Sequence, residues 1–200
     1  MMFKKIGVIF LFLLLSSSFF ATISAVTVND IEFNISKEYQ GGENKTNGYQ
    51  LENIFGIFCI DDNKAQTIGF WAGESEYSKD LEIGNHPVRY YYSYNEYVND
   101  NMSHAFFASG DSFYEIFWVG NEISPDIEKL IKDTPDSNMD SESFYSSVDD
   151  SINQYIQDKN DSFYYDDLYD DYQSSNTPRD SSSKSDYKFR ETLITYSHRY

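Results

Sequence analysis

Apolar and polar residues alternate where the folded part of the chain is expected to begin. Ile31, Phe33 and Ile35 are separated by Glu32 and Asn34. A period of two residues places the three apolar side chains on one face of an extended strand and the polar pair on the other. This segment therefore predicts a strand that is buried on one face.

Two hairpins are predicted further along, from short polar turns between apolar runs. In the first, the runs 51–60 and 65–73 flank a short acidic segment, and in the second the runs 103–108 and 112–120 flank a turn that contains Gly110. Consecutive strands that are joined by short turns pair antiparallel. The middle of the chain is therefore expected to form an antiparallel sheet.

Beyond Val119 the apolar period becomes helical. Ser124 is a good N-cap residue, Pro125 suits the first helical position, and Pro135 ends this first helix. A second helix is predicted from an apolar residue at every fourth position, which forms a stripe that can pack on the sheet. The stripe consists of Phe144, Val148, Ile152 and Ile156.

The strand segments 54–60 and 113–119 carry apolar side chains on both faces. Helices can cover one face of such a sheet, and the other face needs a curled sheet, a second layer or a partner. We therefore predict an α+β domain at residues 26–160, in which two C-terminal helices pack on one face of a curled antiparallel sheet of about five to six strands.

The N-terminus has the order of a secretory signal. Lys4 and Lys5 precede the uncharged apolar run 6–15, and serines follow at 16–18. Small residues near Ala25 permit cleavage there, so we expect residues 1–25 to be a signal peptide. In the alternative interpretation the leader stays uncleaved as a membrane anchor. Both interpretations place the rest of the protein outside the cell or at its surface.

The C-terminal residues 161–200 differ in composition from the predicted domain. The part up to residue 186 is rich in Asp, Ser and Tyr, and this composition favours a disordered acidic tail. Calcium binding by its aspartates is an alternative interpretation. The short segment 187–200 is basic and contains a strand-like run that can pair with a sheet edge.

The overall charge excludes one class of partner. The formal net charge is −18 at pH 7, whereas nucleic-acid binding requires clustered Lys and Arg side chains. The chain has one cysteine, Cys59, so it cannot form an intramolecular disulfide. Cys59 lies among large apolar residues and is expected to be a buried, unreactive side chain.

Tyrosines provide the candidate binding site. Tyr90, Tyr92, Tyr94 and Tyr97 recur within the predicted strand region 87–97. Exposed rings stack on sugars or hold a protein partner. The alternative is that the rings pack against neighbouring strands inside the core.

Candidate catalytic groups form no specific motif. His86, His104 and His198 have no metal-binding spacing. Glu74 and Glu76 can form a carboxylate pair with Asp80, as glycoside hydrolysis requires, but acidic residues are abundant throughout this chain. We predict no catalytic residues and no cofactor.

A partial calcium-loop pattern lies between the two predicted helices. Asp136, Asn138 and Asp140 occupy positions 1, 3 and 5 of that pattern. However, Ser141 replaces the glycine of the loop and Ser147 replaces its bidentate glutamate. We therefore expect a capped turn between helices and no metal site.

Four segments give the chain a layout that resembles uncharacterised small exported α+β proteins of methanogenic archaea. The segments are VTVNDIEFNIS, LEIGNHPVRYYY, FFASGDSFYEIFWVG and SPDIEKLIKDTP. The resemblance covers about the first two thirds of the chain and implies a small exported α+β domain. It implies no functional residues.

These observations favour a non-enzymatic secreted or cell-surface domain that binds a protein or a cell-wall glycan through an aromatic sheet face. A secreted hydrolase that acts on wall polymers, with Glu74 in its acid pair, is a second hypothesis. A calcium-responsive surface protein is a third hypothesis.

Overall fold

The computed structural model describes residues 24–174, and side chains are described through residue 161. Seven strands form an antiparallel sheet in the order β3-β4-β5-β9-β8-β7-β6. In that order, the strands span Glu43–Lys45, Gly48–Leu51, Phe55–Cys59, Ser112–Val119, Asp100–Ser109, His86–Asn95 and Tyr77–Ile83. A separate hairpin consists of β1 (Ser24–Val28) and β2 (Ile31–Ile35).

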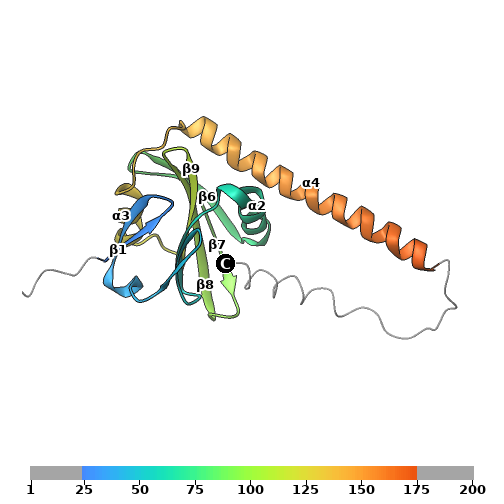
Figure 1. Ribbon diagram of the computed structural model, residues 1–200, viewed down its shortest axis with the longest axis horizontal. Coiled ribbons are helices and arrows are strands. Elements are labelled where there is room, and N and C mark those ends of the chain that lie inside the picture. Colours follow the sequence, from blue (N-terminus) through green and yellow to red (C-terminus); the bar gives the residue numbers. More distant parts are fainter. Residues whose placement is uncertain (1–23, 175–200) are drawn as a thin grey trace, which may run out of the picture.

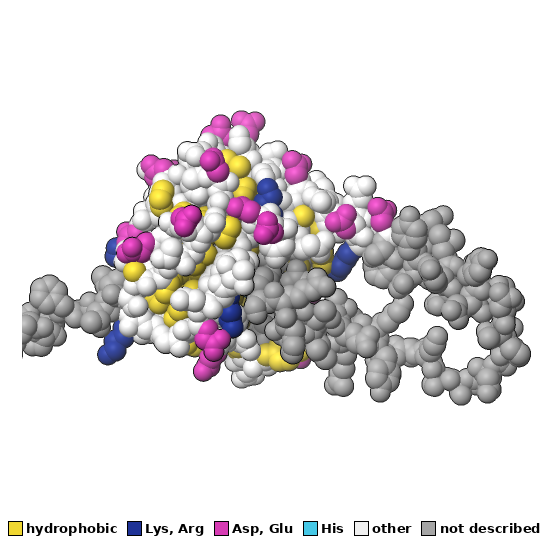
Figure 2. All heavy atoms as spheres, viewed as in Figure 1, with side chains coloured by type: hydrophobic (Ala, Val, Ile, Leu, Met, Phe, Trp, Pro, Cys, Tyr) yellow, Lys and Arg dark blue, Asp and Glu magenta, His cyan; other side chains and the backbone are white. Residues whose placement is uncertain are grey.

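The elements form three layers (Figure 1). The β1–β2 hairpin and helix α3 (Pro125–Lys132) lie on one side of the seven-stranded sheet, which we call the hairpin face. Helices α2 (Lys64–Glu74) and α4 (Ser141–Ser174) lie on the other side, which we call the helix face. Figure 2 shows acidic side chains scattered over the visible surface, with apolar side chains exposed between them.

The α+β class and the antiparallel sheet are therefore confirmed, whereas three finer features of the prediction are wrong. The sheet is not curled, it has seven strands rather than five or six, and helices flank both of its faces. Of the three coverings considered for the second face, a curled sheet, a second layer or a partner, the structure has a second layer, because the N-terminal hairpin covers the face that helices α2 and α4 leave open.

Rings and aliphatic side chains dominate the hairpin face. Phe33 of β2 packs against Tyr114 of β9 with 5.7 Å between ring centroids, and Tyr39 stacks on Phe55 at 4.0 Å. The β1–β2 turn is formed by Asn29 and Asp30, both with positive φ. Asn and Asp tolerate this conformation, which suits a two-residue hairpin turn.

The apolar cluster on the helix face is smaller than the cluster on the hairpin face, and helices α2 and α4 cover it. Phe144 and Val148 of α4 are fully buried against the sheet, and Phe144 stacks on Phe113 with 5.6 Å between centroids. The predicted docking of this stripe is confirmed for these two residues and for Ile152, which is partly buried against the same cluster. Ile156, at the end of the predicted stripe, is 50% exposed. The C-terminal part of α4 extends beyond the sheet (Figure 1).

The prediction of a hairpin between runs 51–60 and 65–73 is wrong, because the second run forms α2. A short turn of 3-10 helix, Asp61–Asn63, leads directly into this helix. Ile68 and Ala72 are four residues apart and both pack on the helix face, as a helical period requires. Strand β5 pairs instead with β9, which arrives about fifty residues later.

Gly69 allows α2 and α4 to approach closely. A Cβ atom at this position would lie 2.2 Å from Cβ of Tyr155 on α4, a distance that real side chains do not reach. The glycine lowers the helix propensity of the run, and this is one reason why the helix was hard to predict. The helix forms nevertheless. Glycine is needed at this position because any larger side chain would clash with Tyr155 of α4.

The turn and cap predictions in the second half of the chain are confirmed. Gly110 has a φ of +57° in the turn that joins β8 to β9. The Ser124 hydroxyl accepts a hydrogen bond from the Ile127 N–H at 3.3 Å, and Pro125 is the first residue of α3. Asp140 caps α4, because its carboxylate accepts the Ser143 N–H at 2.8 Å.

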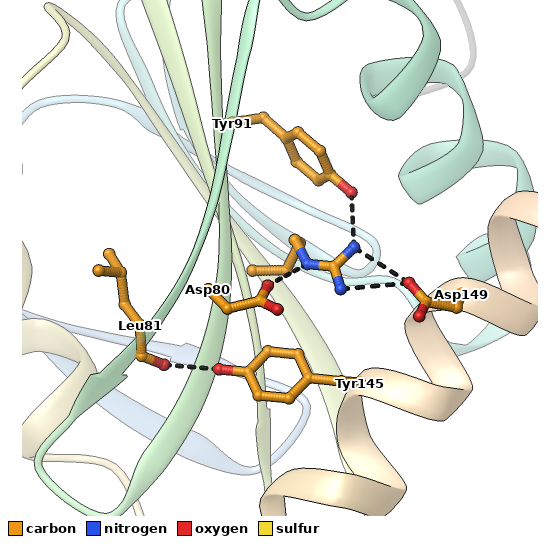
Figure 3. A network of polar contacts seen from close by, with 6 residues as sticks. Asp80, Leu81, Tyr91, Tyr145 and Asp149 are labelled. Carbon is orange, nitrogen blue, oxygen red and sulfur yellow. Dashed lines mark hydrogen bonds and ion pairs between the residues drawn. The ribbon is translucent and has the colours of Figure 1, made fainter.

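Arg89 of β7 joins the edge of the sheet to α4 (Figure 3). Its guanidinium donates to Asp80 of β6, and it contacts Asp149 of α4 with both terminal nitrogens at 3.1 Å. Tyr145 of α4 donates its hydroxyl to the Leu81 carbonyl oxygen at 2.8 Å. These contacts connect α4 to two strands at once.

Both ends of the chain lie partly outside the described residues. Residues 1–23 of the predicted leader lie outside the described residues, whereas its last two residues, Ser24 and Ala25, begin strand β1. The predicted tail lies outside them from residue 175 onward, and helix α4 continues from the predicted domain through Ser174. Within residues 24–174, no helix has both the length and the apolar character that crossing a membrane requires.

Candidate functional site: an exposed tyrosine patch

Large exposed apolar side chains gather at one corner of the sheet. Three of the five such side chains within the described residues belong to the β6–β7 edge and the turn that follows β7. These three are Tyr77, Tyr94 and Tyr97, with exposed fractions of 40%, 51% and 81%; the other two are Ile54 and Ile156. We define the tyrosine patch as Tyr77, Tyr92, Tyr94 and Tyr97.

The patch continues into the hydrophobic core as a row of rings. Tyr77 stacks on Tyr92 across the β6–β7 pair, with 4.9 Å between centroids. Tyr92 lies 6.0 Å from Tyr90, which in turn stacks on Trp118 at 5.8 Å. Tyr77 and Tyr92 therefore rest on the buried rings of Tyr90 and Trp118, which restricts their motion.

Tyr90 belongs to that base and not to the exposed surface. It is 4% exposed, its hydroxyl lies 2.8 Å from the Ser103 hydroxyl, and it donates to the Asn121 carbonyl oxygen at 2.8 Å. Burial raises the pKa of the Tyr90 phenol above its ordinary value of 10. Of the four tyrosines proposed from the sequence, Tyr90 is therefore a core residue, whereas Tyr92 is half-buried and Tyr94 and Tyr97 are exposed.

Hydrogen bonds fix the turn that carries the outer rings. The Asn95 side-chain oxygen accepts the backbone N–H groups of Tyr97 at 2.9 Å and Val98 at 3.4 Å. The Tyr94 hydroxyl donates to the side-chain oxygen of Asn99 at 2.8 Å. A preorganised turn loses little conformational entropy when a partner binds.

The sequence missed Tyr77 as a member of this patch. Strand β6 is an edge strand whose residues are mostly exposed, so its alternation of apolar and polar residues is weak. The partial alternation of Leu81 and Ile83 with Asp80 and Glu82 was the signal available. Only its pairing with β7 places the Tyr77 ring against Tyr92.

The three residues of the hydrolase hypothesis belong to the end of α2, the segment that follows it and strand β6. Glu74 is the last residue of α2. The backbone N–H of Glu76 donates to the Tyr92 carbonyl oxygen at 3.2 Å, and Asp80 is bound to Arg89. The structure therefore gives these three carboxylates no common partner.

The three residues of the calcium-loop pattern also have separate partners. Asp136 accepts from the Asn85 amide at 3.2 Å, and Asn138 donates to Asp111 at 2.9 Å. Asp140 caps α4, and the hydrogen bond from the backbone of Ser143 lowers the pKa of its carboxyl. The part of the chain that the structure describes holds no group of three or more His, Cys, Asp or Glu side chains arranged for a metal ion.

One buried polar pair was not recognised from the sequence. His104 and Glu115 point toward the helix face, with 2.7 Å between the His104 Nδ1 and a Glu115 carboxylate oxygen. Trp71 of α2 stacks on the His104 ring at 3.6 Å. The predicted β8–β9 hairpin was the available signal, because its Gly110 turn fixes a register that brings these residues close together.

The other two histidines have different settings. His86 is 1% exposed, and its Nδ1 lies 2.9 Å from the Ala108 carbonyl oxygen. Its Nε2 lies 3.3 Å from the Thr134 hydroxyl, so this ring joins the sheet to the segment after α3. His198 lies outside the described residues.

Comparison with known proteins adds no family: no family model, curated protein or solved structure matches this chain. The likeness to exported archaeal proteins stays a prediction.

Proposed function

We propose that the protein is a non-enzymatic secreted or cell-surface domain that binds a protein or a cell-wall glycan through the tyrosine patch. The observation that supports this proposal is the concentration of exposed rings at one corner of a sheet whose faces are otherwise covered by the chain itself. Clustered exposed apolar groups are typical of interaction surfaces, whereas isolated ones are common on any protein.

The β1–β2 hairpin reduces the area of the sheet face that is free to bind a partner, compared with the open aromatic face expected from the sequence. It covers the aromatic sheet face over Tyr114 and Phe55, which leaves the corner at β6, β7 and the following turn. Rings held by stacking and by turn hydrogen bonds make efficient anchors, because few side-chain torsions are lost on binding.

The test is retention of the purified full chain on washed cell envelopes of the organism that makes it. A Tyr94→Ser and Tyr97→Ser double variant should bind roughly tenfold more weakly or worse, since exposed anchor rings each contribute on the order of 1 kcal/mol. Ile54→Ser is the matched control, because Ile54 is also an exposed apolar residue but lies outside the patch. Equal retention of the double variant and the control would refute the proposal.

Export is the second part of the proposal. Mass spectrometry of the protein recovered from the culture medium or from the envelope should find an N-terminus near residue 26 if the leader is cleaved. Recovery from the cytoplasmic fraction alone would contradict export. In the retention assay, circular dichroism of the tyrosine double variant and of the Ile54→Ser control checks that a loss of retention does not result from unfolding.

A further inference from the structure

We infer that the partner of the tyrosine patch is positively charged, as a Lys- or Arg-rich segment of another protein is. This inference rests on the proposed function and adds the chemical class of the partner. It is drawn from the charges around the patch, from the ring chemistry and from the positions of the chain's own cations.

Carboxylates surround the patch. Glu76 precedes Tyr77 and is bound through its backbone to Tyr92. Glu96 lies in the turn between Tyr94 and Tyr97, and the pairing partner of Asn95 is Asp100.

A fourth carboxylate lies at the inner end of the row of rings. Glu122 is close enough to Tyr90 for its negative charge to contribute to the raised pKa of that phenol, after the larger effects of burial and of the neighbouring tyrosines. Its backbone carbonyl oxygen accepts the Trp118 indole N–H at 3.0 Å. Acidic residues therefore flank Tyr77 and the turn that carries Tyr94 and Tyr97, and a further one lies near Tyr90 at the base of the patch.

Nothing on the described part of the chain neutralises these four carboxylates. Among the ion pairs within residues 24–161, none includes Glu76, Glu96, Asp100 or Glu122. One basic residue, Lys79, lies opposite Tyr90 on the β6–β7 pair. The formal net charge of the whole chain, −18, strengthens the negative potential at this corner.

The cations that contact rings elsewhere are occupied at the helix face. The Lys64 ammonium lies 4.2 Å from the centroid of the Phe113 ring and 2.8 Å from the Ser147 hydroxyl. Arg89 lies over Tyr145 and binds two aspartates. Within the described residues, none of the cation–ring contacts involves a tyrosine of the patch, so the exposed rings of Tyr94 and Tyr97 are available to a cation from another molecule.

The combination of open ring faces and unpaired carboxylates selects among partners. A Lys or Arg side chain is attracted by the ring quadrupole and pairs with the adjacent carboxylates, so both features contribute to its binding. A neutral glycan uses only the ring faces. An anionic glycan, a nucleic acid or an acidic membrane surface is repelled.

The experiment measures binding of the full chain to a labelled peptide of alternating Arg and Ser by fluorescence anisotropy. A peptide of alternating Gln and Ser is the neutral probe, and a chitin oligosaccharide is the glycan probe. A Tyr94→Leu and Tyr97→Leu variant removes two ring faces but keeps apolar side chains. The corresponding Tyr→Phe variant keeps both faces.

Charge is tested with a second pair of variants. Glu96→Gln with Glu122→Gln removes two carboxylates at the patch. Glu32→Gln with Asp62→Asn is the matched control, because it removes two exposed carboxylates elsewhere. The control also reports how much peptide binds to the acidic chain without specificity.

The expected result is preferential binding of the Arg peptide. Its affinity should fall roughly tenfold in the Tyr→Leu variant and severalfold in the Glu→Gln pair, and stay within about twofold of wild type in the Tyr→Phe variant and the charge control. Raising the salt concentration from 50 to 200 mM should weaken binding.

Two outcomes would overturn the inference and separate it from the proposed function. Salt-independent, ring-dependent binding of the oligosaccharide would show that the patch binds a glycan, so the proposed function would stand and the charge inference would fail. Equal peptide affinity in all variants would refute the inference. If envelope retention were also unaffected by the tyrosine substitutions, the proposed function would fail with it.

Discussion

The two faces of the central sheet are closed in different ways. The hairpin face carries the larger apolar cluster, built around Phe33, Tyr114 and their neighbours. Its few buried polar side chains, among them His86 and Ser103, contact backbone carbonyl oxygens or hydroxyl groups and form no ion pair within the described residues. The helix face combines a smaller apolar cluster with polar contacts, among them the His104–Glu115 pair, the Lys64–Ser147 hydrogen bond and the Arg89 contacts.

The difference indicates where stability and specificity reside. Burial of apolar area supplies most of the folding free energy but is not directional. Buried polar pairs add little net stability but require one arrangement, because an unpaired buried group is costly. We therefore expect the hairpin face to hold the fold together and the polar contacts of the helix face to fix the positions of α2 and α4.

The largest expected effect is on the hairpin face. Phe33→Ala removes a ring that is 1% exposed between the second layer and the sheet, and should lower the free energy of unfolding by about 3–5 kcal/mol. Urea denaturation followed by circular dichroism measures this. Ile54→Ala, at an exposed position, should change the stability by only about 0.5 kcal/mol. A comparably small effect of Phe33→Ala would show that the hairpin is not part of the cooperative core.

The polar pair of the helix face should show a different pattern. Glu115→Leu leaves the buried His104 without its partner and should cost about 3 kcal/mol. The double variant His104→Leu with Glu115→Leu should recover most of that loss, since no polar group is then left unpaired. A double-mutant cycle in the same denaturation assay measures the coupling. Additive losses would indicate that the pair contributes through packing alone.

The contact between α2 and α4 is tested by two glycines of the same helix. Gly69→Ala places a methyl group against Tyr155 and should destabilise the protein by about 1–3 kcal/mol. Gly73→Ala meets nothing within 4 Å and should stabilise it by about 0.5–1 kcal/mol through higher helix propensity. Thermal unfolding distinguishes the two. Similar effects at both positions would mean that the helices do not approach as closely as described.

The smallest expected effect concerns the start of α4 and depends on pH. The Asp140 carboxylate accepts the Ser143 N–H, which lowers its pKa below the ordinary value of 3.8. A group whose folded pKa is depressed contributes stability above its unfolded pKa, and this contribution is lost as the pH falls through the folded value. Asp140→Asn keeps a capping side chain without a titrating charge.

The stability difference between wild type and Asp140→Asn should therefore be present at pH 7 and shrink as the pH falls below 3.8 and through the lower folded pKa. Unfolding midpoints measured at several pH values over this range provide the test. A difference that is independent of pH would show that the charge of Asp140 has no role in capping.

Much of the fold could be predicted from local patterns. The β8–β9 hairpin follows from two alternating runs around Gly110, and α3 follows from Ser124 and Pro125. The apolar character of β5 and β9 on both faces indicated that both faces must be covered, and a second layer was one of the three coverings that it left open. Each of these features depends on residues that are close together in the sequence, so the sequence alone is sufficient to predict it.

Features that depend on distant segments could not be predicted in this way. The run that forms α2 is apolar and short, so its period fits a strand as well as a helix until α4 lies against Gly69. Likewise, the alternation of tyrosines along β7 assigns their faces but not their exposure. The sequence therefore suggested Tyr90 as a binding residue although it is buried, and it missed Tyr77.

The sequence by itself determined that this protein has an antiparallel sheet with two apolar faces, a capped pair of later helices and an acidic surface. Only the tertiary structure decided which segments cover those faces and which tyrosines stay exposed. The physical reason is that the burial of a ring depends on what is folded over it, and the elements beside Tyr90 include a strand and a loop far from it in the chain.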